Sequence, residues 1–446
     1  MMEHWDVVVV GGSAAGLTAA ITARRHYPDK RTLLIRREER VLIPCGIPYI
    51  FGTVGALDKD LIPDGLLTQN GIELLVDEVV GLDREGHTVT TAGGRQIGYE
   101  RLVLATGSLP VMPPVAGFDK PNVYAIYKDA ALLEALQRDL QAARRVVVVG
   151  GGFIGVEIAD ECNKLANVQE VRIVEMLPHC LLVSYDEEFC TAAEDLLRER
   201  GIHVHTGSKV SKVIGDGRAT GVLLDSGETL EADAVILGIG ATASVELARK
   251  AGLPLGPTGS VQVDRTMRTE DERVFACGDC AEKVSFFGGK PSPLKLASIA
   301  CAEARIAGAN LYGIRRENVG TVGVWSTALG DTAFATAGLT ENLARRHGYD
   351  FVIGVSEGPD RHPGCMPGAS VLKVKLLFER RTRVIIGAQI MGGRCAGEMI
   401  NIASACIQRR MTLDDVAAFQ MGTHPALTAS PIAYQFVNAA EAALQL

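Results

Sequence analysis

The sequence has few aromatic residues, no long run of like charge and no extended apolar segment. Phe, Trp and Tyr make up only 5% of its 446 residues. Lys and Arg number 45 against 53 Asp and Glu, a formal net charge of −8, so there is no basic footprint for a nucleic acid. Apolar runs such as Val146–Val149 are short and end at glycine, as buried strands do. We expect neither a nucleic-acid partner nor a membrane-embedded chain.

We also expect no secretory leader. Residues 1–6 contain no basic region followed by a long apolar one, and an expected strand, Val7–Val10, follows directly. The 10 cysteines show no regular pairing of the kind seen in disulfide frameworks. We therefore expect a cytoplasmic protein whose thiols are reduced.

The composition that is present favours an α/β fold. Hydrophobic residues reach 47% and glycines number 49, which suits Val-rich parallel strands packed under helices and joined by Gly-rich turns. The chain is also too long for one ordinary domain. Two or three domains are expected.

One nucleotide-binding pattern occurs twice. Four valines run into Gly11 before an expected helix at 17–25, and four more run into Gly150 before an expected helix at 156–165. In this pattern the first glycine makes the turn, the next small residue lets the backbone approach a pyrophosphate, and the last lets helix pack on strand. The predicted contact positions are Gly11, Ser13, Ala14 and Gly16 in the first copy, and Gly150, Gly152, Ile154 and Gly155 in the second.

The residue that ends the next strand indicates which nucleotide is bound. Glu175 ends the second unit's strand and can accept hydrogen bonds from a ribose 2′-hydroxyl, and no Arg or Lys follows it to meet a 2′-phosphate, which favours NADH. In the first unit, Arg36 stands at this point. Either Glu38 or Glu39 takes the ribose role after a register shift, or Arg36 stacks on the adenine or contacts a phosphate.

With these motifs in this order, the chain resembles the FAD-dependent pyridine nucleotide–disulfide oxidoreductases over nearly its whole length. The segment Pro44-Cys45-Gly46-Ile47-Pro48-Tyr49 is similar to the branch with a single active-site cysteine. That branch comprises coenzyme A-disulfide reductases, NADH oxidases and peroxidases, and NADH-dependent persulfide or polysulfide reductases. Ile50 stands where CxxxxC members carry a second cysteine. Cys45 is therefore expected to be oxidised by an external species, to a sulfenic acid, a persulfide or a mixed disulfide.

The resemblance implies two Rossmann-like nucleotide-binding domains, for FAD and NADH, and a C-terminal α+β dimerisation domain in a homodimer. We expect an FAD-binding domain at 1–115 and 248–320, an NAD(H)-binding domain at 116–247, and a dimerisation domain at 321–446. In the last domain, strands are expected at 371–378 and 384–391, with a helix at 398–409.

Further strand ends supply candidate cofactor contacts. An aspartate, Asp279, ends a strand before a helical stretch at 294–312, where its carboxylate and helix-terminal amides could hold a flavin's ribityl hydroxyls. The predicted contacts of this kind are Ala105, Thr106, Gly107, Gly240, Asp279 and Ala297. Cys277 and Cys280 have CxxC spacing, but no second pair completes a zinc site, so no metal is expected.

Three residues are the predicted catalytic groups. Cys45 is the expected nucleophile, its pKa lowered by turn amides after Pro44. Glu157 resembles the glutamate that faces the nicotinamide in relatives, with a surface ion pair as the alternative. His424 resembles the histidine of a His-Pro segment that reaches the partner's active site, where it is a candidate general acid. A capping or core histidine is the alternative there.

Binding of coenzyme A stays open. The segment at 362–369 resembles the one in which coenzyme A-disulfide reductases present a tyrosine, but Cys365 or Met366 replaces it here. Cys365 could be a second thiol brought to the active site from the partner chain. Arg24 and Arg25 resemble coenzyme A phosphate contacts, and a solvated basic face explains them equally well.

The predicted function is NADH-dependent reduction of a low-molecular-weight disulfide, persulfide or polysulfide through Cys45. The nearest alternative is an NADH oxidase or peroxidase that cycles Cys45 through sulfenic acid, with oxygen or peroxide as acceptor. A flavin-based redox sensor or electron-transfer partner is the third reading.

Overall fold

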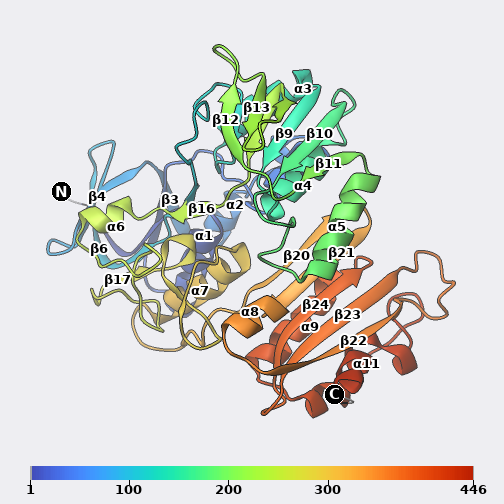
Figure 1. Ribbon diagram of the computed structural model, residues 1–446. Helices are drawn as coiled ribbons and strands as arrows, with labels where there is room; N and C mark the ends of the chain where they lie inside the picture. Colours follow the sequence, from blue (N-terminus) through green and yellow to red (C-terminus); the bar gives the residue numbers. More distant parts are fainter. Residues whose placement is uncertain (1–2, 445–446) are drawn as a thin grey trace.

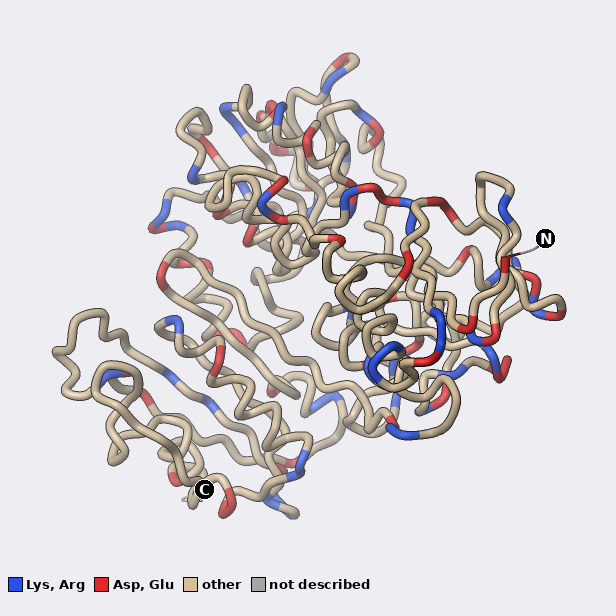
Figure 2. The backbone as a smooth tube through the Cα atoms, turned by 180° about the vertical axis from the view of Figure 1, so that it is seen from behind, with Lys and Arg blue, Asp and Glu red and all other residues tan. Residues whose placement is uncertain are grey.

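Three units, each built around its own sheet, make up the chain (Figure 1). The computed structural model describes residues 3–444. Met1 and Met2, which belong to the N-terminal segment in which no leader is expected, lie outside the described residues. Within the described residues, no helix combines the length and apolar character that crossing a membrane requires. Acidic and basic residues are interspersed along all three units (Figure 2).

The first unit is a seven-stranded sheet in the order β3-β2-β1-β6-β5-β4, with β17 also paired to β6. Its central part is parallel, and the apolar residues of β1 and β6 are buried. The helix α1 packs on β1 and β2, and α7 packs along α1. The elements are β1 (Glu3–Val10), α1 (Ala14–His26), β2 (Thr32–Arg36), α2 (Gly65–Gln69), β3 (Ile72–Val76), β4 (Val79–Asp83), β5 (Thr88–Thr91), β6 (Gln96–Leu104), α6 (Glu246–Lys250), β17 (Val274–Ala276), β18 (Lys283–Val284), β19 (Pro291–Ser292) and α7 (Ala297–Asn310).

The second unit is a five-stranded parallel sheet in the order β11-β10-β9-β15-β8, with a small antiparallel sheet, β12-β13-β14, beside it. The two chain crossings between the first and second units lie side by side, because β7 pairs with β16. The elements are β7 (Ser108–Pro110), β8 (Val123–Ala125), α3 (Ala130–Ala142), β9 (Arg145–Val149), α4 (Phe153–Cys162), β10 (Glu170–Val174), α5 (Glu187–Glu199), β11 (Ile202–His205), β12 (Val210–Ile214), β13 (Gly221–Leu224), β14 (Thr229–Glu231), β15 (Ala234–Leu237) and β16 (Ala241–Ala243).

The third unit is a five-stranded antiparallel sheet in the order β20-β21-β24-β23-β22. The helix α9 packs on β21 and β24, and α11 packs on β22 and β23. The elements are β20 (Val324–Leu329), β21 (Thr332–Gly338), α8 (Glu341–Arg346), β22 (Phe351–Pro359), β23 (Val371–Glu379), β24 (Ile385–Gly392), α9 (Ala396–Gln408), α10 (Leu413–Ala417) and α11 (Gln435–Ala443). The predicted fold class is confirmed; the residue limits assigned to the domains stay predictions.

Two helices begin earlier than the sequence suggested. The first starts at Ala14 rather than residue 17, and the second at Phe153 rather than 156. The reason is that the residue after each glycine turn, Ser13 or Gly152, is already the N-cap. The small residues read as turn therefore form the first helical turn, whose amides have no intrahelical partner.

A buried lysine joins the second and third units. Lys375, on β23, places its Nζ 2.9 Å from Asp186, 2.6 Å from Glu188 and 2.6 Å from Glu341. These carboxylates lie within 4.8 Å of one another, and the lysine supplies the cation between them. Since Asp186 and Glu188 come from the second unit, this ion cluster fixes α5 to the C-terminal sheet.

Candidate active site

The first glycine turn, at residues 11–16, has no room for a side chain at Gly11 or Gly16. Gly11 has φ +115°, and a Cβ there would lie 2.1 Å from the carbonyl oxygen of Ala105. A Cβ at Gly16 would lie 1.8 Å from the oxygen of Gly11. Within the described chain, the Ser13 side chain makes no capping hydrogen bond, so it leaves the first-turn amides of α1 without a side-chain partner. Such a helix start fits an anionic phosphate group.

A cavity of about 210 Å³ opens beside this turn, and its lining includes Gly11, Arg36, Glu38 and Thr106. The Arg36 guanidinium is buried and donates to both carboxylate oxygens of Asp64, at 2.7 and 2.9 Å. It also donates to the carbonyls of Glu38 and Glu39, at 2.8 and 3.0 Å. These hydrogen bonds occupy the polar edge of the Arg36 guanidinium. They therefore favour stacking of its flat face on the adenine over contact with a phosphate. Of the two glutamates left open above, Glu38 is the one in the lining.

The second glycine turn repeats this geometry. Gly150 has φ +105°, and a Cβ at Gly155 would lie 1.9 Å from the oxygen of Gly150. At Gly152 no atom lies within 4 Å of a Cβ position, and the Ile154 side chain is 40% exposed. The approach to the start of α4 is open.

Glu175 is buried beneath this second turn. Its carboxylate accepts from the Gly151 amide at 2.5 Å and from the Leu177 amide at 2.7 Å. A Cβ at Gly151 would lie 3.0 Å from the Cβ of Glu175, and a Cβ at Gly12 would lie 2.5 Å from the Cδ of Arg36. Arg36 thus occupies in the first unit the position that Glu175 occupies in the second. The two strand ends correspond without a shift of register that would bring Glu38 or Glu39 to this position.

Cys45 lies in the turn before a short 3₁₀ helix, η1 (Ile47–Ile50), and is an exposed residue. The Gly46 amide is already bonded to the Ile43 carbonyl at 2.9 Å, so it does not serve the sulfur. Removal of water by surrounding groups and the nearby Glu157 charge raise the pKa of Cys45, while Lys128 opposes them. The expected lowering of its pKa by turn amides is therefore wrong for the chain as folded.

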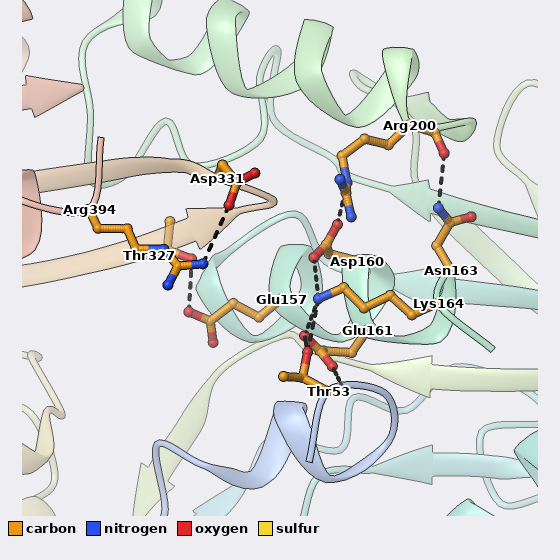
Figure 3. Close-up of polar contacts among 10 residues, drawn as sticks. All are labelled: Thr53, Glu157, Asp160, Glu161, Asn163, Lys164, Arg200, Thr327, Asp331 and Arg394. Atoms are coloured by element: carbon orange, nitrogen blue, oxygen red, sulfur yellow. Dashed lines mark hydrogen bonds and ion pairs between the residues drawn. The ribbon is translucent and has the colours of Figure 1, made fainter. Parts of the chain in front are cut away.

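Glu157 projects from α4 towards the third unit (Figure 3). Thr327, on β20, donates its hydroxyl to Glu157 Oε1 at 2.8 Å. Burial raises the pKa of Glu157 to about 7, although the Thr327 bond works in the opposite direction. Among residues 3–444 it forms no ion pair, so the surface-ion-pair alternative is not found. The 3₁₀ helix η1, which follows Cys45, packs on α4, and the Glu157 charge contributes to the raised pKa of Cys45.

The same helix holds the segment that carries Cys45 (Figure 3). Glu161 is buried and accepts from the Thr53 amide at 2.5 Å and from its hydroxyl at 2.9 Å. Lys164 donates to Glu161 at 2.6 Å and pairs with Asp160 at 3.0 Å, and Arg200 pairs with Asp160 at 2.7 Å. These contacts bind η1 of the first unit to α4 of the second.

Asp279 lies in the 3₁₀ turn η3 (Gly278–Cys280), where Ser108 donates to it at 2.7 Å and Lys128 pairs with it at 3.2 Å. Burial opposes its charge, but Lys128 and Ser108 hold the pKa of Asp279 below its ordinary value. Lys128 belongs to no motif and was missed by the sequence, as was Thr327. Each is a single residue that only the packing of two units brings to the site.

The remaining predicted contacts lie around these turns. Ala105 is buried against Gly11, and the Thr106 hydroxyl donates to the Ser244 carbonyl at 2.6 Å. Gly107 and Gly240 have φ +72° and +97°, with no atom within 4 Å of a Cβ position. Ala297 is the first residue of α7.

His424 and Cys365 lie in two loops of the third unit that are bonded to each other. The His362 amide donates to the Pro425 carbonyl at 3.1 Å, and His362 Nδ1 lies 3.0 Å from the Thr428 carbonyl. His424 is exposed, and its Nδ1 accepts from the Ala426 amide at 3.2 Å, a local capping contact. No contact within the described chain brings His424 to Cys45, so its role across a dimer stays a prediction.

The Arg24 guanidinium is largely engaged by the chain itself. It donates to the carbonyls of Pro28, Lys30 and Asn70, at 2.7, 2.6 and 3.3 Å. These bonds tie the end of α1 to the loops beside it. Arg25 is exposed.

Comparison with known proteins places this geometry in one family. Residues 5–304 match the model of the pyridine nucleotide-disulphide oxidoreductases, and residues 324–432 match the model of their dimerisation domain. A CoA-dependent NAD(P)H sulfur oxidoreductase of Pyrococcus furiosus is 30% identical, with 93% of this chain and 94% of the relative aligned. An NADH oxidase of Methanocaldococcus jannaschii is 28% identical, with 92% of each chain aligned.

Solved structures give the same result. The NAD-dependent persulfide reductase from A. fulgidus superimposes with a TM-score of 0.91 at 30% identity, covering 99% of this chain and 83% of that one. The NADH-bound water-forming NADH oxidase from Lactobacillus brevis gives 0.88 at 26% identity, covering 99% and 98%.

Proposed function

The chain belongs to the pyridine nucleotide-disulphide oxidoreductase family, and from that premise we propose that it uses NADH to reduce a low-molecular-weight disulfide, persulfide or polysulfide at Cys45. It is a flavoprotein oxidoreductase that uses FAD and NADH. The observation that carries the proposal is an exposed, unpaired Cys45 just before η1, which packs on α4 of the second nucleotide-binding unit, the helix that carries Glu157.

We assign FAD to the first unit and NADH to the second. The amides at the start of α1 would hold the FAD pyrophosphate, and the cavity lined by Arg36 and Glu38 would receive its adenosine. Asp279 would accept from the ribityl chain, and Glu175 from the NADH ribose. When bound, FAD takes the hydride from NADH and passes the electrons on as a pair.

Two residues have separate proposed roles in the chemistry of Cys45: one supplies a positive charge and the other a proton. Lys128 favours the thiolate that must attack the sulfur substrate, because its charge lowers the pKa of Cys45. Burial raises the pKa of Glu157 to about 7, so the carboxyl is partly protonated at neutral pH and its protonated form can give a proton to a leaving thiolate. Glu157 is therefore a candidate proton donor from the same chain. It would act in addition to His424 of the partner subunit, which the resemblance predicts to be a general acid.

We further propose a cytoplasmic homodimer. The dimerisation-domain match at residues 324–432 supports the dimer, and the 10 free thiols suit a reducing compartment. A disulfide or persulfide of coenzyme A is a candidate substrate, since the P. furiosus relative is described as CoA-dependent. Because backbone carbonyls engage two of the three guanidinium nitrogens of Arg24, recognition of such a ligand would fall mainly to other residues.

The second candidate function is NADH oxidation with oxygen or peroxide as acceptor. It is supported by NADH oxidases among the relatives, which align over 92% of the chain. In that case Cys45 would cycle through a sulfenic acid.

Reoxidation kinetics distinguish the two candidates. The enzyme is reduced anaerobically with NADH and mixed with coenzyme A disulfide, polysulfide, oxygen or peroxide, while flavin absorbance is followed. We expect a sulfur acceptor to reoxidise wild type fastest and Cys45→Ser to bind NADH but lose this reaction. Cys406→Ser, a buried thiol of the third unit, is the control. Faster reoxidation by oxygen or peroxide would favour the second function.

A further inference from the structure

A buried ion pair adjoins the turn that carries Asp279. Lys283, on β18, and Glu303, on α7, are only 2% and 1% exposed. The Nζ of Lys283 lies 3.3 Å from the Oε2 of Glu303. Removing two charges from water costs free energy that their mutual attraction often does not offset, so such a pair is weak evidence for stability. Its contacts with the backbone indicate a local role instead.

The two side chains hold both backbone groups of Gly278, the residue before Asp279. The Oε2 of Glu303 accepts from the Gly278 amide at 2.9 Å. The Lys283 ammonium donates to the Gly278 carbonyl at 2.6 Å and to the Ala281 carbonyl at 3.1 Å. The Gly278 carbonyl also accepts from the Ala281 amide at 3.0 Å, which is a bond within the turn itself. The ion pair thus fixes the backbone of η3 from two other elements.

Gly278 also lies close to the helix start that we assign to FAD. Its φ is +78°, and a Cβ there would lie 2.7 Å from the Cβ of Ala15 and 3.5 Å from the Cβ of Ala300. Ala15 belongs to the first turn of α1, and Ala300 belongs to α7. The η3 turn therefore packs between these two helices, and a shift of the turn would move Asp279 relative to the start of α1.

The carboxylate of Glu303 depends on Lys283. Its Oε1 is enclosed and, among residues 3–444, has no hydrogen-bond partner. Within the same residues, only the Gly278 amide and Lys283 stabilise the charge of this carboxylate. Removal of Lys283 would leave a buried charge with a single donor, which is strongly unfavourable.

We propose that Lys283 and Glu303 are positioning residues for FAD: they hold the η3 turn where the Asp279 carboxylate can accept from the ribityl chain. The inference rests on the proposed function only through the assignment of FAD to the first unit. Asp279 is then held twice, through its side chain by Ser108 and Lys128 and through its backbone by the ion pair. Loss of the pair should speed FAD release although Asp279 itself is unchanged.

The test compares FAD release with unfolding in the purified holoenzyme. Release is followed by the rise of free FAD fluorescence after dilution, at a temperature well below Tm, and stability is measured by urea unfolding. The variants are Lys283→Met, the double variant Lys283→Met/Glu303→Gln, and Asp279→Asn. Lys30→Met is the matched control, because Lys30 pairs with Glu100 at 2.6 Å in the same unit.

We expect Lys283→Met to release FAD about tenfold faster than wild type and to be less stable, because Glu303 is left buried without its cation. The double variant should regain stability, since no unpaired charge remains. It should still release FAD several-fold faster, because the introduced glutamine can accept from the Gly278 amide but no donor replaces the lysine on the Gly278 carbonyl. Lys30→Met should release FAD at the wild-type rate.

Two results overturn the inference alone. One is wild-type FAD release from folded Lys283→Met, and the other is a double variant that regains both stability and the wild-type release rate, which would make the pair structural only. If Lys283→Met does not fold, the double variant decides the question. Unchanged FAD release from Asp279→Asn overturns the assignment of Asp279 and the inference with it. None of these results depends on the acceptor that Cys45 reduces.

Discussion

The hydroxyl of Thr327 donates to the carboxylate of Glu157 across the boundary between the second and third units, at 2.8 Å. One hydrogen bond thus connects the C-terminal sheet to the buried Glu157 of α4 (Figure 3). Because the bond favours the charged carboxylate, it limits how far burial raises the pKa of Glu157. The third unit therefore tunes the proton at the active site.

Thr327→Val should raise the pKa of Glu157 further. A hydrogen bond to a charged group contributes about 1.5–3 kcal/mol. In the pH profile of the reduction rate, we therefore expect the fall in rate at alkaline pH to move to higher pH by roughly one to two units. The measurement is the pH dependence of single-turnover substrate reduction. Thr332→Val, on the neighbouring strand, should leave the limb in place. An unmoved limb in folded Thr327→Val would show that Glu157 does not supply the proton.

Glu157→Gln should change how stability depends on pH. The pKa of Glu157 is raised from 4.5 to about 7, so the folded state binds this proton more tightly than the unfolded state does. That contribution is complete below pH 4.5 and is lost as pH rises through about 7. Glutamine stays neutral and can still accept from Thr327. Relative to wild type, the variant should gain on the order of 2 kcal/mol between pH 5 and pH 8, measured by urea unfolding.

Glu161→Ala should loosen the segment that carries Cys45. It leaves the Thr53 amide and hydroxyl without their acceptor, and Lys164 without one of its partners. The expected loss is about 2–3 kcal/mol of unfolding free energy, with a lower Tm. Asp195→Ala removes an exposed carboxylate paired with Arg198 and should cost less than about 1 kcal/mol. Equal losses in the two variants would refute a holding role for Glu161.

Lys128→Met should slow the chemistry of Cys45 at neutral pH. Its ammonium opposes the burial and the Glu157 charge that raise the pKa of Cys45, so its removal raises that pKa further. We expect the alkylation of Cys45 by iodoacetamide at pH 7 to slow several-fold, with its midpoint displaced to higher pH. Peptide mass spectrometry quantifies the site. Lys59→Met, at an exposed lysine of the 3₁₀ turn η2 (Leu57–Asp60), is the control.

Glu175→Ala should weaken NADH more than NADPH. Removing an acceptor for the ribose hydroxyl costs about 1–3 kcal/mol, which corresponds to roughly 5- to 150-fold in kcat/KM for NADH. NADPH lacks the free 2′-hydroxyl and loses its repulsion from the carboxylate. Steady-state kinetics with both nucleotides give the ratio. If the ratio is unchanged while Tm falls, Glu175 serves only to brace the Gly151 turn.

Much of the scaffold could be predicted because its signals are local. A run of valines ending at Gly11 or Gly150 can only be a buried strand entering a tight turn, and the structure confirms both turns. The helix starts were misplaced by three residues, since an N-cap residue is hard to separate from a turn residue in sequence. The predicted direction of the Cys45 pKa shift was wrong because it was argued from the residue's own turn, whereas burial by the folded chain and then the charge of Glu157, from another unit, raise that pKa.

By itself, the sequence determined the α/β class and the two glycine turns, and it predicted Cys45 as the nucleophile, because each depends on residues adjacent in the chain. Only the tertiary structure decided which charges act on that sulfur: Lys128, and Glu157 with its partner Thr327, come from separate elements. Electrostatic and hydrogen-bond energies depend on distance in space, and packing of the three units sets those distances.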